Sequence, residues 1–403
     1  MKRLILAAAL AASFSAPSVH AAERLAVTVE HDLAIARPSE TISIPWSEVN
    51  AVLPGALIQK IAVKDAQGRV LPHQVTNVAP LAKDPKNAGI AYGELLFQHS
   101  FAPGEKRAAF TVEKTEALAP VFPVKAFARY VPERLDDFAW ENDKIAHRTY
   151  GPALAAPAQP GVTKEVLVTS GLDLWFKRVE YPIVDRWYNK GHDHYHHDEG
   201  EGMDMYNVGK SRGAGGTGVW DGKQLYTGVN YASWKVLANG PVRAVFELHY
   251  ANWDAGGRQV SEVKRFTVDA GHYLDRIDST FSFTGFEPVT VAAGLNRTPS
   301  DKGQNPQIAT RREGAVLLQW VGQASNDAFG TAVVVPGAEG FAQDALNELI
   351  LAKASSGKPL RYYAGGAWSR AGEITSLEQW LRLAQDMAAR DGNPVRVTLA
   401  RKP

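Results

Sequence analysis

The sequence predicts a mainly β protein, built as a large antiparallel β-sandwich with few helices. Three observations support this fold class: short stretches with alternating apolar residues, turn-forming Gly, Pro and Asn between them, and only one clear helical pattern. Many short strands separated by turns are typical of sandwich architecture. The expected elements follow in chain order.

The first part of the mature chain reads as strands and hairpins. Asp65-Ala-Gln-Gly68 is a turn between two short strands, and Pro103-Gly104 joins two longer stretches that look like a pair. The expected strands are residues 25–29, 41–44, 60–64, 69–71, 92–101 and 107–114.

The middle of the chain carries the clearest strand pattern. Val242, Ala244, Phe246, Leu248 and Tyr250 alternate with polar residues, so they are expected to share one face of a strand. Similar stretches surround it, separated by turns rich in Gly and Asp. The expected strands are residues 234–237, 242–250, 259–268 and 273–283.

One helix is expected near the C-terminus. Ser376 can cap its start, with Gln379 at the third position of a capping box. An apolar stripe then runs from Leu377 to Ala388, and Asp391-Gly-Asn-Pro394 ends the helix. A strand at 395–399 follows, so we expect this helix to cover a sheet.

The ends and the composition limit the possible classes of protein. Residues 1–21 have a basic start, a short apolar run and a small-residue cleavage signal, so they predict a signal peptide and export to the bacterial periplasm or medium. Residues 22–403 are expected to form a single sandwich domain, with a possible sub-boundary near 120–160, where proline is frequent. The chain has no Cys, which excludes disulfides and thiolate metal ligands.

The charge balance argues against two kinds of partner. With 44 basic and 43 acidic residues, the net charge is +1. Neither a basic nucleic-acid footprint nor a polybasic membrane patch is evident, and no stretch after the signal peptide is long and apolar enough to span a bilayer. We therefore expect neither nucleic acid nor a membrane span. The oligomeric state is open.

One face of the central strand carries polar residues. Arg243, Glu247 and His249 share this face, opposite the apolar one. A sheet with such a face can form the floor of a binding cleft. The alternative, common for antiparallel sheets, is a solvated face with cross-strand ion pairs.

A second group of candidate residues lies between 136 and 150. Trp140 can stack on a sugar face, while its neighbours can hydrogen-bond hydroxyls or a carboxylate. The alternative is a strand edge with ordinary ion pairs. Trp368 in a later aromatic cluster is a further candidate, with core packing as the alternative. The polar candidates in the first group are Glu141, Asn142, His147 and Arg148.

The segment from residue 192 to 218 concentrates titrating side chains among glycines. His194, His196 and Asp198 are spaced so that a divalent metal such as Zn, Mn or Ca can be bound, whereas a His-rich surface loop is the alternative. Tyr195, Glu201 and Asp204 are candidate catalytic residues. The glycine-rich stretch that follows lacks the first Gly of a phosphate loop, so no nucleotide is expected; its Lys210 and Arg212 can meet an anion.

These segments together resemble a known family. Asp136-Asp-Phe-Ala-Trp-Glu-Asn-Asp143, Glu201-Gly-Met-Asp204 and Gly213-Ala-Gly-Gly216 are similar to motifs of the bacterial secreted family called domain of unknown function 4861. The chain departs at Glu199, where relatives are expected to have His. The resemblance implies a β-supersandwich like that of galactose mutarotase and several polysaccharide lyases, and a place beside enzymes that degrade uronic-acid glycans.

Four functional hypotheses follow. The first, which the sequence favours, is β-elimination on a uronate-containing glycan, with His196 or His249 as base and Tyr195 as acid. The second is a glycoside hydrolase using Glu201 with Glu141 or Asp204. The third is a sugar mutarotase or epimerase with one His and one Glu. The fourth is a non-catalytic glycan-binding protein, in which exposed Trp side chains such as Trp140 and Trp368 bind the sugar.

Overall fold

The computed structural model describes residues 24–76, 93–300, 307–323 and 327–402. The predicted signal peptide therefore lies outside the described residues. Strands account for 49% of the protein and helices for 13%, which confirms the mainly β fold class. All strand pairs within the named sheets are antiparallel.

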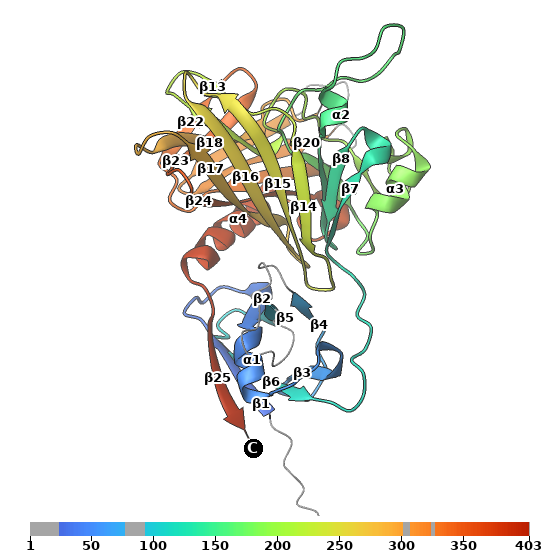
Figure 1. Ribbon diagram of the computed structural model, residues 1–403, viewed down its shortest axis with the longest axis vertical. Helices are drawn as coiled ribbons and strands as arrows, with labels where there is room; N and C mark the ends of the chain where they lie inside the picture. The colour runs from blue at the N-terminus through green and yellow to red at the C-terminus, as the bar shows by residue number, and fades with distance from the viewer. Residues whose placement is uncertain (1–23, 77–92, 301–306, 324–326, 403) are drawn as a thin grey trace, which may run out of the picture.

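An N-terminal unit lies below a larger sandwich in Figure 1. It contains a four-stranded and a three-stranded sheet with one short helix, α1 (Trp46–Val52). The last strand of the chain joins the first sheet beside β1, so both ends of the described chain meet in this unit. The sheets, in spatial order, are β25 (Arg396–Lys402), β1 (Arg24–Glu30), β6 (Arg107–Lys114) and β3 (Ile61–Asp65), and β2 (Arg37–Pro45), β5 (Glu94–Phe101) and β4 (His73–Thr76).

One predicted pairing in this unit is wrong. β5 and β6 were expected to pair with each other, but they belong to different sheets. The two strands instead share a core, in which the rings of Phe97 and Phe110 meet edge to face with centroids 4.9 Å apart. Alternation predicts which face of a strand is apolar, but it does not show which sheet the strand joins. Two strands can bury their apolar faces against each other across a sandwich without being hydrogen-bonded to each other.

The larger unit is built on an eight-stranded sheet. This sheet contains the central strands that the sequence predicts. Four further strands, from residue 307 onward, complete it. Its strands, in spatial order, are β14 (Ser233–Ala238), β15 (Arg243–Asp254), β16 (Gln259–Asp269), β17 (Leu274–Phe283), β24 (Pro359–Trp368), β21 (Ala328–Val334), β20 (Val316–Gly322) and β19 (Gln307–Glu313).

Two five-stranded sheets cover the inner face of the eight-stranded sheet. They lie next to each other, because a single bridge joins Leu172 to Gly213. A large apolar core fills the space between the layers. The strands are β13 (Leu225–Tyr226), β12 (Ala214–Trp220), β18 (Val289–Asn296), β23 (Asn347–Ala354) and β22 (Gly340–Gln343), and β11 (Gly202–Asp204), β10 (Asp173–Lys177), β9 (Ile145–Thr149), β8 (Asp137–Glu141) and β7 (Phe127–Val131).

Strand β15 confirms the predicted alternation. Val242, Ala244, Phe246, Leu248 and Tyr250 are all buried, and Phe246 stacks on Phe266 of β16 with the rings 4.6 Å apart. The polar side chains of β15 lie on the opposite, outer face of the sheet. That outer face is the one nearest the N-terminal unit and helix α4 (Leu377–Gly392).

Helix α4 also forms as predicted. The Ser376 hydroxyl accepts a hydrogen bond from the backbone N–H of Gln379, which caps the first turn. Its apolar stripe packs on the outer face of β20 and β21, where Trp380 is fully buried and donates to the carbonyl of Thr331.

The N-terminal unit and the sandwich each have an apolar core of their own. Polar contacts join the two. The Gln74 amide donates to the Arg243 carbonyl and accepts from its N–H, while Gln98 donates to the carbonyl of Ala270. The expectation of a single domain over 22–403 is not tested by these contacts and stays a prediction.

A small helical layer covers the outer face of the β7–β11 sheet. It consists of α3 (Val184–Lys190) and the 3-10 turn η3 (His194–His196), preceded in the chain by the short helix α2 (Pro152–Ala155). Trp187, Tyr188 and Tyr195 pack there against Trp175 of β10. The three remaining 3-10 turns are η1 (Ile58–Lys60), η2 (Pro132–Arg134) and η4 (Ser369–Ala371).

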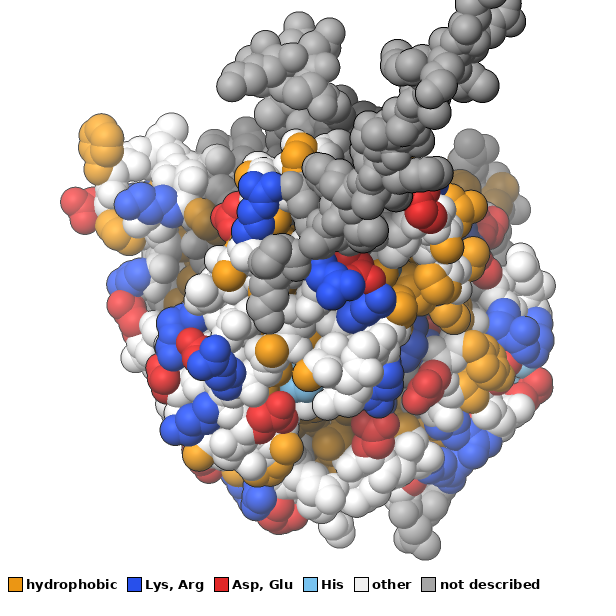
Figure 2. All heavy atoms as spheres, turned by 90° about the horizontal axis from the view of Figure 1, so that it is seen from below, with side chains coloured by type: hydrophobic (Ala, Val, Ile, Leu, Met, Phe, Trp, Pro, Cys, Tyr) orange, Lys and Arg blue, Asp and Glu red, His pale blue; other side chains and the backbone are white. Residues whose placement is uncertain are grey.

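The surface agrees with the neutral charge balance. On the face shown in Figure 2, acidic and basic side chains are interspersed rather than gathered by sign. None of the helices in the described part of the chain has the length and apolar character needed to cross a membrane.

Candidate functional site

A cavity of about 440 Å³ lies beside the outer face of the β7–β11 sheet. Residues from two distant segments, 134–167 and 192–209, meet around it. These segments overlap the predicted walls of the site, 136–150 and 192–218. The lining residues are Arg134, Arg148, Tyr150, Glu165, Leu167, His192, His196, Asp204, Met205, Tyr206, Asn207, Val208 and Gly209.

A buried charge cluster lies at one side of this cavity. The guanidinium of Arg148 contacts three carboxylates: its Nε is 2.7 Å from Asp173 Oδ2, its Nη2 is 3.2 Å from Asp204 Oδ2, and its Nη1 is 3.6 Å from Asp137 Oδ2. All four side chains are at most 7% exposed. We call these four residues the acid cluster. Arg148 is the only cation in contact with all three acids in the described structure.

Strand register brings the acid cluster together. Arg148 lies directly opposite Asp173 on the neighbouring strand, and Trp175 lies opposite Asp204. Gly202 permits the close approach of β11, because its φ is +128° and an added Cβ would lie 2.0 Å from the Phe176 carbonyl oxygen. Residues far apart in the sequence thus become cross-strand neighbours on one face.

The surplus of acids perturbs their protonation. Burial raises the pKa of Asp137 to about 6, against the opposing charges of Arg148 and Arg134. Burial, and then the charge of Asp173, raise the pKa of Asp204 well above its ordinary value, although Arg148 opposes the shift. Three buried carboxylates around one guanidinium cannot all ionise cheaply, so the raised pKa favours the protonated form of Asp204.

His196 connects the acid cluster to the cavity. Its Nδ1 lies 3.3 Å from the backbone oxygen of Asp204 and 3.8 Å from Oδ2 of the same residue. Its Nε2 lies 3.4 Å from Nε2 of His192, and both rings line the cavity. The neighbouring Tyr195 is instead buried, stacked on Trp175 with centroids 4.7 Å apart.

A second carboxylate lies in the same cavity with the opposite tendency. Glu165 is half-exposed and accepts a hydrogen bond from Arg134 Nη2 at 2.6 Å. Its burial would raise its pKa, but this bond and the charges of Arg134, Arg148 and His192 outweigh that effect and lower it. The cavity therefore contains two carboxyl groups whose pKa values are shifted in opposite directions, that of Asp204 upward and that of Glu165 downward.

Most of the predicted residues between 140 and 148 have structural contacts. Glu141 accepts from the first backbone N–H groups of α3 at 2.9 Å and from Lys177 Nζ at 2.7 Å. Asn142 donates to the carbonyls of Asp269 and His272. His147 is buried, and burial lowers its pKa to about 3, so it is neutral. Of this group, only Arg148 lines the cavity.

The expected exposure of two tryptophans is wrong. Trp140 and Trp368 are 1% and 2% exposed, and their indole N–H groups donate to Asp275 and Asp327. The cause is that the core covers one face of β8 and the α3 layer covers the other, while Trp368 belongs to the main core. Neither ring is available for stacking on a sugar.

The candidate residues in the glycine-rich segment lie in different surroundings and do not meet in the cavity. Glu201 accepts hydrogen bonds from Tyr181 and from Arg186 and Trp187 of α3. It does not line the cavity. Arg212 is buried, donates to the Ser170 hydroxyl at 2.7 Å, and has its pKa lowered to about 10 by burial. Lys210 is exposed at the surface.

The three predicted metal ligands do not converge. His194 Nδ1 lies 3.1 Å from Glu199, whereas Asp198 pairs with Arg178 and Arg370. Within the described ranges, no group of three or more acidic or histidine side chains is arranged to hold a metal ion. The predicted ligand set is thus corrected, because its side chains point to separate partners around η3.

The predicted floor and walls belong to two different cavities. Arg243 and Glu247 line a hollow of about 680 Å³ on the outer face of the eight-stranded sheet, which shares no lining residue with the cavity of Asp204. His249 is 44% exposed and lies 3.8 Å from Glu247. The expected single cleft is therefore wrong: the β7–β11 sheet packs against the inner face, opposite these side chains.

Sequence reasoning missed Glu165, Arg134 and Asp173. Glu165 is the only acid between Asp143 and Asp173, within a stretch otherwise rich in Ala, Pro and Val, and this isolation was the available signal. Arg134 lies two residues before the first quoted motif and lines the cavity, whereas Asp173 becomes a neighbour of Arg148 only through the pairing of β10 with β9.

The chain belongs to the family described as domain of unknown function DUF4861, whose model matches residues 29–397. It is 30% identical over 416 residues to an uncharacterized protein, P7, of Formosa agariphila, covering 99% of this chain and all of that protein. Among solved structures, an alpha-mannosidase from Enterococcus faecalis V583 matches 94% of the chain with a TM-score of 0.49 and 9% identity. A glycosyl hydrolase family 38 protein from Enterococcus faecalis matches with a TM-score of 0.47 and 9% identity. The chain spans about half the length of these two structures, 46% and 47%.

Proposed function

We propose that the protein is an exported glycoside hydrolase acting on uronic-acid-containing glycans, with Asp204 as the acid and Glu165 as the second carboxylate. One observation carries the proposal: the two carboxyl groups line the same cavity, and their environments shift their pKa values in opposite directions. Glycoside hydrolysis requires one protonated and one ionised carboxyl group.

Each residue then has a defined part in the reaction. Asp204 donates its proton to the oxygen of the leaving sugar. Glu165 either attacks the anomeric carbon or activates a water molecule. Arg134 keeps Glu165 ionised, and its guanidinium, which also lines the cavity, can bind the carboxylate of a uronate. Arg148, which also lines the cavity, positions Asp204 by donating a hydrogen bond from its Nη2 to Asp204 Oδ2.

β-Elimination is a second candidate, supported by the histidine pair. His196 and His192 line the same cavity with their Nε2 atoms 3.4 Å apart, so at least one of these nitrogens is an acceptor when both rings are neutral. Such a ring can remove the proton beside a uronate carboxylate, while Arg134 stabilises the charge that develops. Tyr195 is a weaker candidate for the acid, because it is buried away from the cavity.

Product analysis separates the two reactions. The purified mature protein is incubated with a panel of uronate-containing oligosaccharides and their neutral counterparts, and products are followed by chromatography and ultraviolet absorbance. Hydrolysis yields saturated products with new reducing ends. Elimination yields unsaturated products that absorb in the ultraviolet. Binding without any turnover would favour the glycan-binding hypothesis and contradict the proposal.

Matched variants test the two carboxyl groups. Asp204→Asn and Glu165→Gln are each expected to lower kcat by about 10²–10⁴-fold. Glu133→Gln is the control for Glu165, since Glu133 is also half-exposed and also accepts from an arginine at 2.6 Å, but outside the cavity. Asp275→Asn is the control for Asp204, since Asp275 is likewise buried with a raised pKa.

The variants also discriminate between the hypotheses. If elimination is the reaction, His196→Ala abolishes turnover and Glu165→Gln does not. If the pair predicted from sequence is correct instead, Glu201→Gln is as damaging as Glu165→Gln. Full activity of Glu165→Gln would refute the proposed hydrolytic pair.

A further inference from the structure

One polar side chain in the cavity of Asp204 has no part in the proposed reaction. Asn207 lines this cavity, is half-buried, and follows Asp204 on the same segment of chain. The three residues between the two Cα atoms span about 10 Å at most, even when fully extended. The amide is therefore close enough to the proposed acid to contact the same glycan chain.

The backbone of Asn207 is fixed by its neighbours. Its N–H donates to the Pro299 carbonyl at 2.8 Å, and its carbonyl accepts from Asn296 Nδ2 at 2.5 Å. The side chains before and after it, Tyr206 and Val208, are 6% and 3% exposed and belong to the main core. Because the backbone is already held, only side-chain rotation is left to be ordered when a ligand binds.

The side-chain amide of Asn207, in contrast, has no hydrogen-bond partner among the residues that the structure describes. Gly209 beside it brings no side chain over the amide, and a Cβ there would lie 3.8 Å from Asn207 Oδ1. Gly209 also lines the cavity, so the amide is open to the cavity on this side. Two N–H donors and one acceptor oxygen are therefore available to a ligand.

The other polar side chains that line the cavity bond to a partner within the protein or are enclosed by it. The pairs are Arg134 with Glu165, Arg148 with Asp204, Tyr150 with Asp173, and His196 with His192. The hydroxyl of Tyr206 is buried. Among the described lining residues, Asn207 is thus the neutral group whose hydrogen-bonding capacity is left for a ligand.

We infer that Asn207 binds hydroxyl groups of the glycan and selects a sugar with two free neighbouring hydroxyls at this position. The inference rests on the proposed function, because it takes the cavity to be the glycan site. A carboxamide donates from its nitrogen and accepts at its oxygen, which suits adjacent hydroxyls that each donate and accept. Since the amide is uncharged, the uronate carboxylate is left to Arg134.

Calorimetry tests the inference without requiring turnover. The Asp204→Asn protein, with and without Asn207→Ala, is titrated with the same panel of uronate-containing oligosaccharides, each in its free and its O-methylated form. Asn207→Ala is expected to weaken binding of the free form by about 5–30-fold, because two hydrogen bonds are lost. The O-methylated form, whose oxygens no longer donate, is expected to change by less than about twofold. The preference for the free form is therefore expected to collapse in the variant.

Asn189→Ala is the control, because Asn189 is an exposed asparagine of α3 outside the cavity lining. It is expected to leave both affinities unchanged. Should Asn207→Ala not fold, Asn207→Leu keeps a similar volume without donors or acceptors and is expected to show the same loss.

The possible outcomes separate this inference from the proposed function. Unchanged binding in Asn207→Ala would overturn the inference and leave the proposed function in place. Equal weakening of the free and O-methylated forms would also overturn it, because Asn207 would then shape the cavity without binding hydroxyls. If the Asp204→Asn protein binds no member of the panel, the proposed function fails, and the inference fails with it.

Discussion

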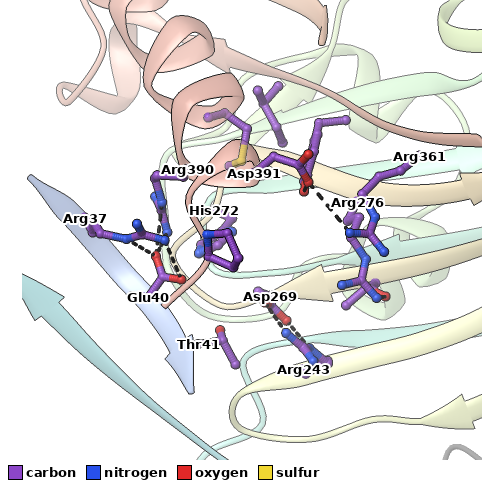
Figure 3. Close-up of a pocket in the computed structure, with 15 residues that line it drawn as sticks. Arg37, Glu40, Thr41, Arg243, Asp269, His272, Arg276, Arg361, Arg390 and Asp391 are labelled. Carbon is purple, nitrogen blue, oxygen red and sulfur yellow. Dashed lines mark hydrogen bonds and ion pairs between the residues drawn. The ribbon is translucent and has the colours of Figure 1, made fainter. Parts of the chain in front are cut away.

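Two polar networks of this protein use the same kinds of side chain in different proportions. In the acid cluster, three carboxylates surround one buried guanidinium. Between the N-terminal unit and the sandwich, five guanidiniums pair with five carboxylates; the residues are Arg37, Arg243, Arg276, Arg361 and Arg390, with Glu40, Glu94, Asp269, Asp278 and Asp391. Figure 3 shows most of this second network. The first arrangement has too little positive charge to keep every acid ionised, whereas the second is balanced.

This difference has a chemical consequence. A surplus of buried acids raises carboxyl pKa values, which favours their protonated forms. In the balanced network the opposite happens: burial would raise the pKa of Asp269, but the charge and hydrogen bonds of Arg243 outweigh it and lower this pKa to about 2. We therefore assign proton transfer to the acid cluster and a structural part to the balanced network.

The largest expected effect comes from removing the single cation of the acid cluster. Arg148→Met leaves Asp137, Asp173 and Asp204 buried without their shared partner and is expected to lower the free energy of unfolding by about 3–5 kcal/mol at pH 7, as measured by urea denaturation. Arg178→Met, which breaks a more exposed pair with Asp198, is expected to cost about 0–1 kcal/mol. If both variants lose equally little free energy of unfolding, the pairing of Arg148 with the three acids does not stabilise the fold.

Local features of this protein were predictable from sequence. The alternation of β15 and the capped start of α4 depend on residues a few positions apart, and the structure reproduces both. The apolar face of a strand follows from side-chain period alone. Sheet membership does not, which explains why β5 and β6 were paired incorrectly.

The candidate site was only partly predictable for a related reason. Arg148, His196 and Asp204 stood out as titratable residues near glycines, and the structure brings them to one cavity. Their long-range neighbours Asp173 and Glu165 depend on strand order and on the path of a loop, which no local pattern encodes. Trp140 was misplaced because a single sequence does not reveal that both faces of its strand are covered.

A smaller effect tests the origin of the proton held by Asp204. Asp173→Asn removes the neighbouring charge that, after burial, raises the pKa of Asp204 the most, so that pKa falls. Because Asp204 acts as an acid only while protonated, the alkaline limb of the kcat/KM profile is expected to move to lower pH by about one unit. Asp198→Asn, outside the cluster, leaves the limb in place. A limb that does not move in Asp173→Asn would mean that burial alone controls the proton.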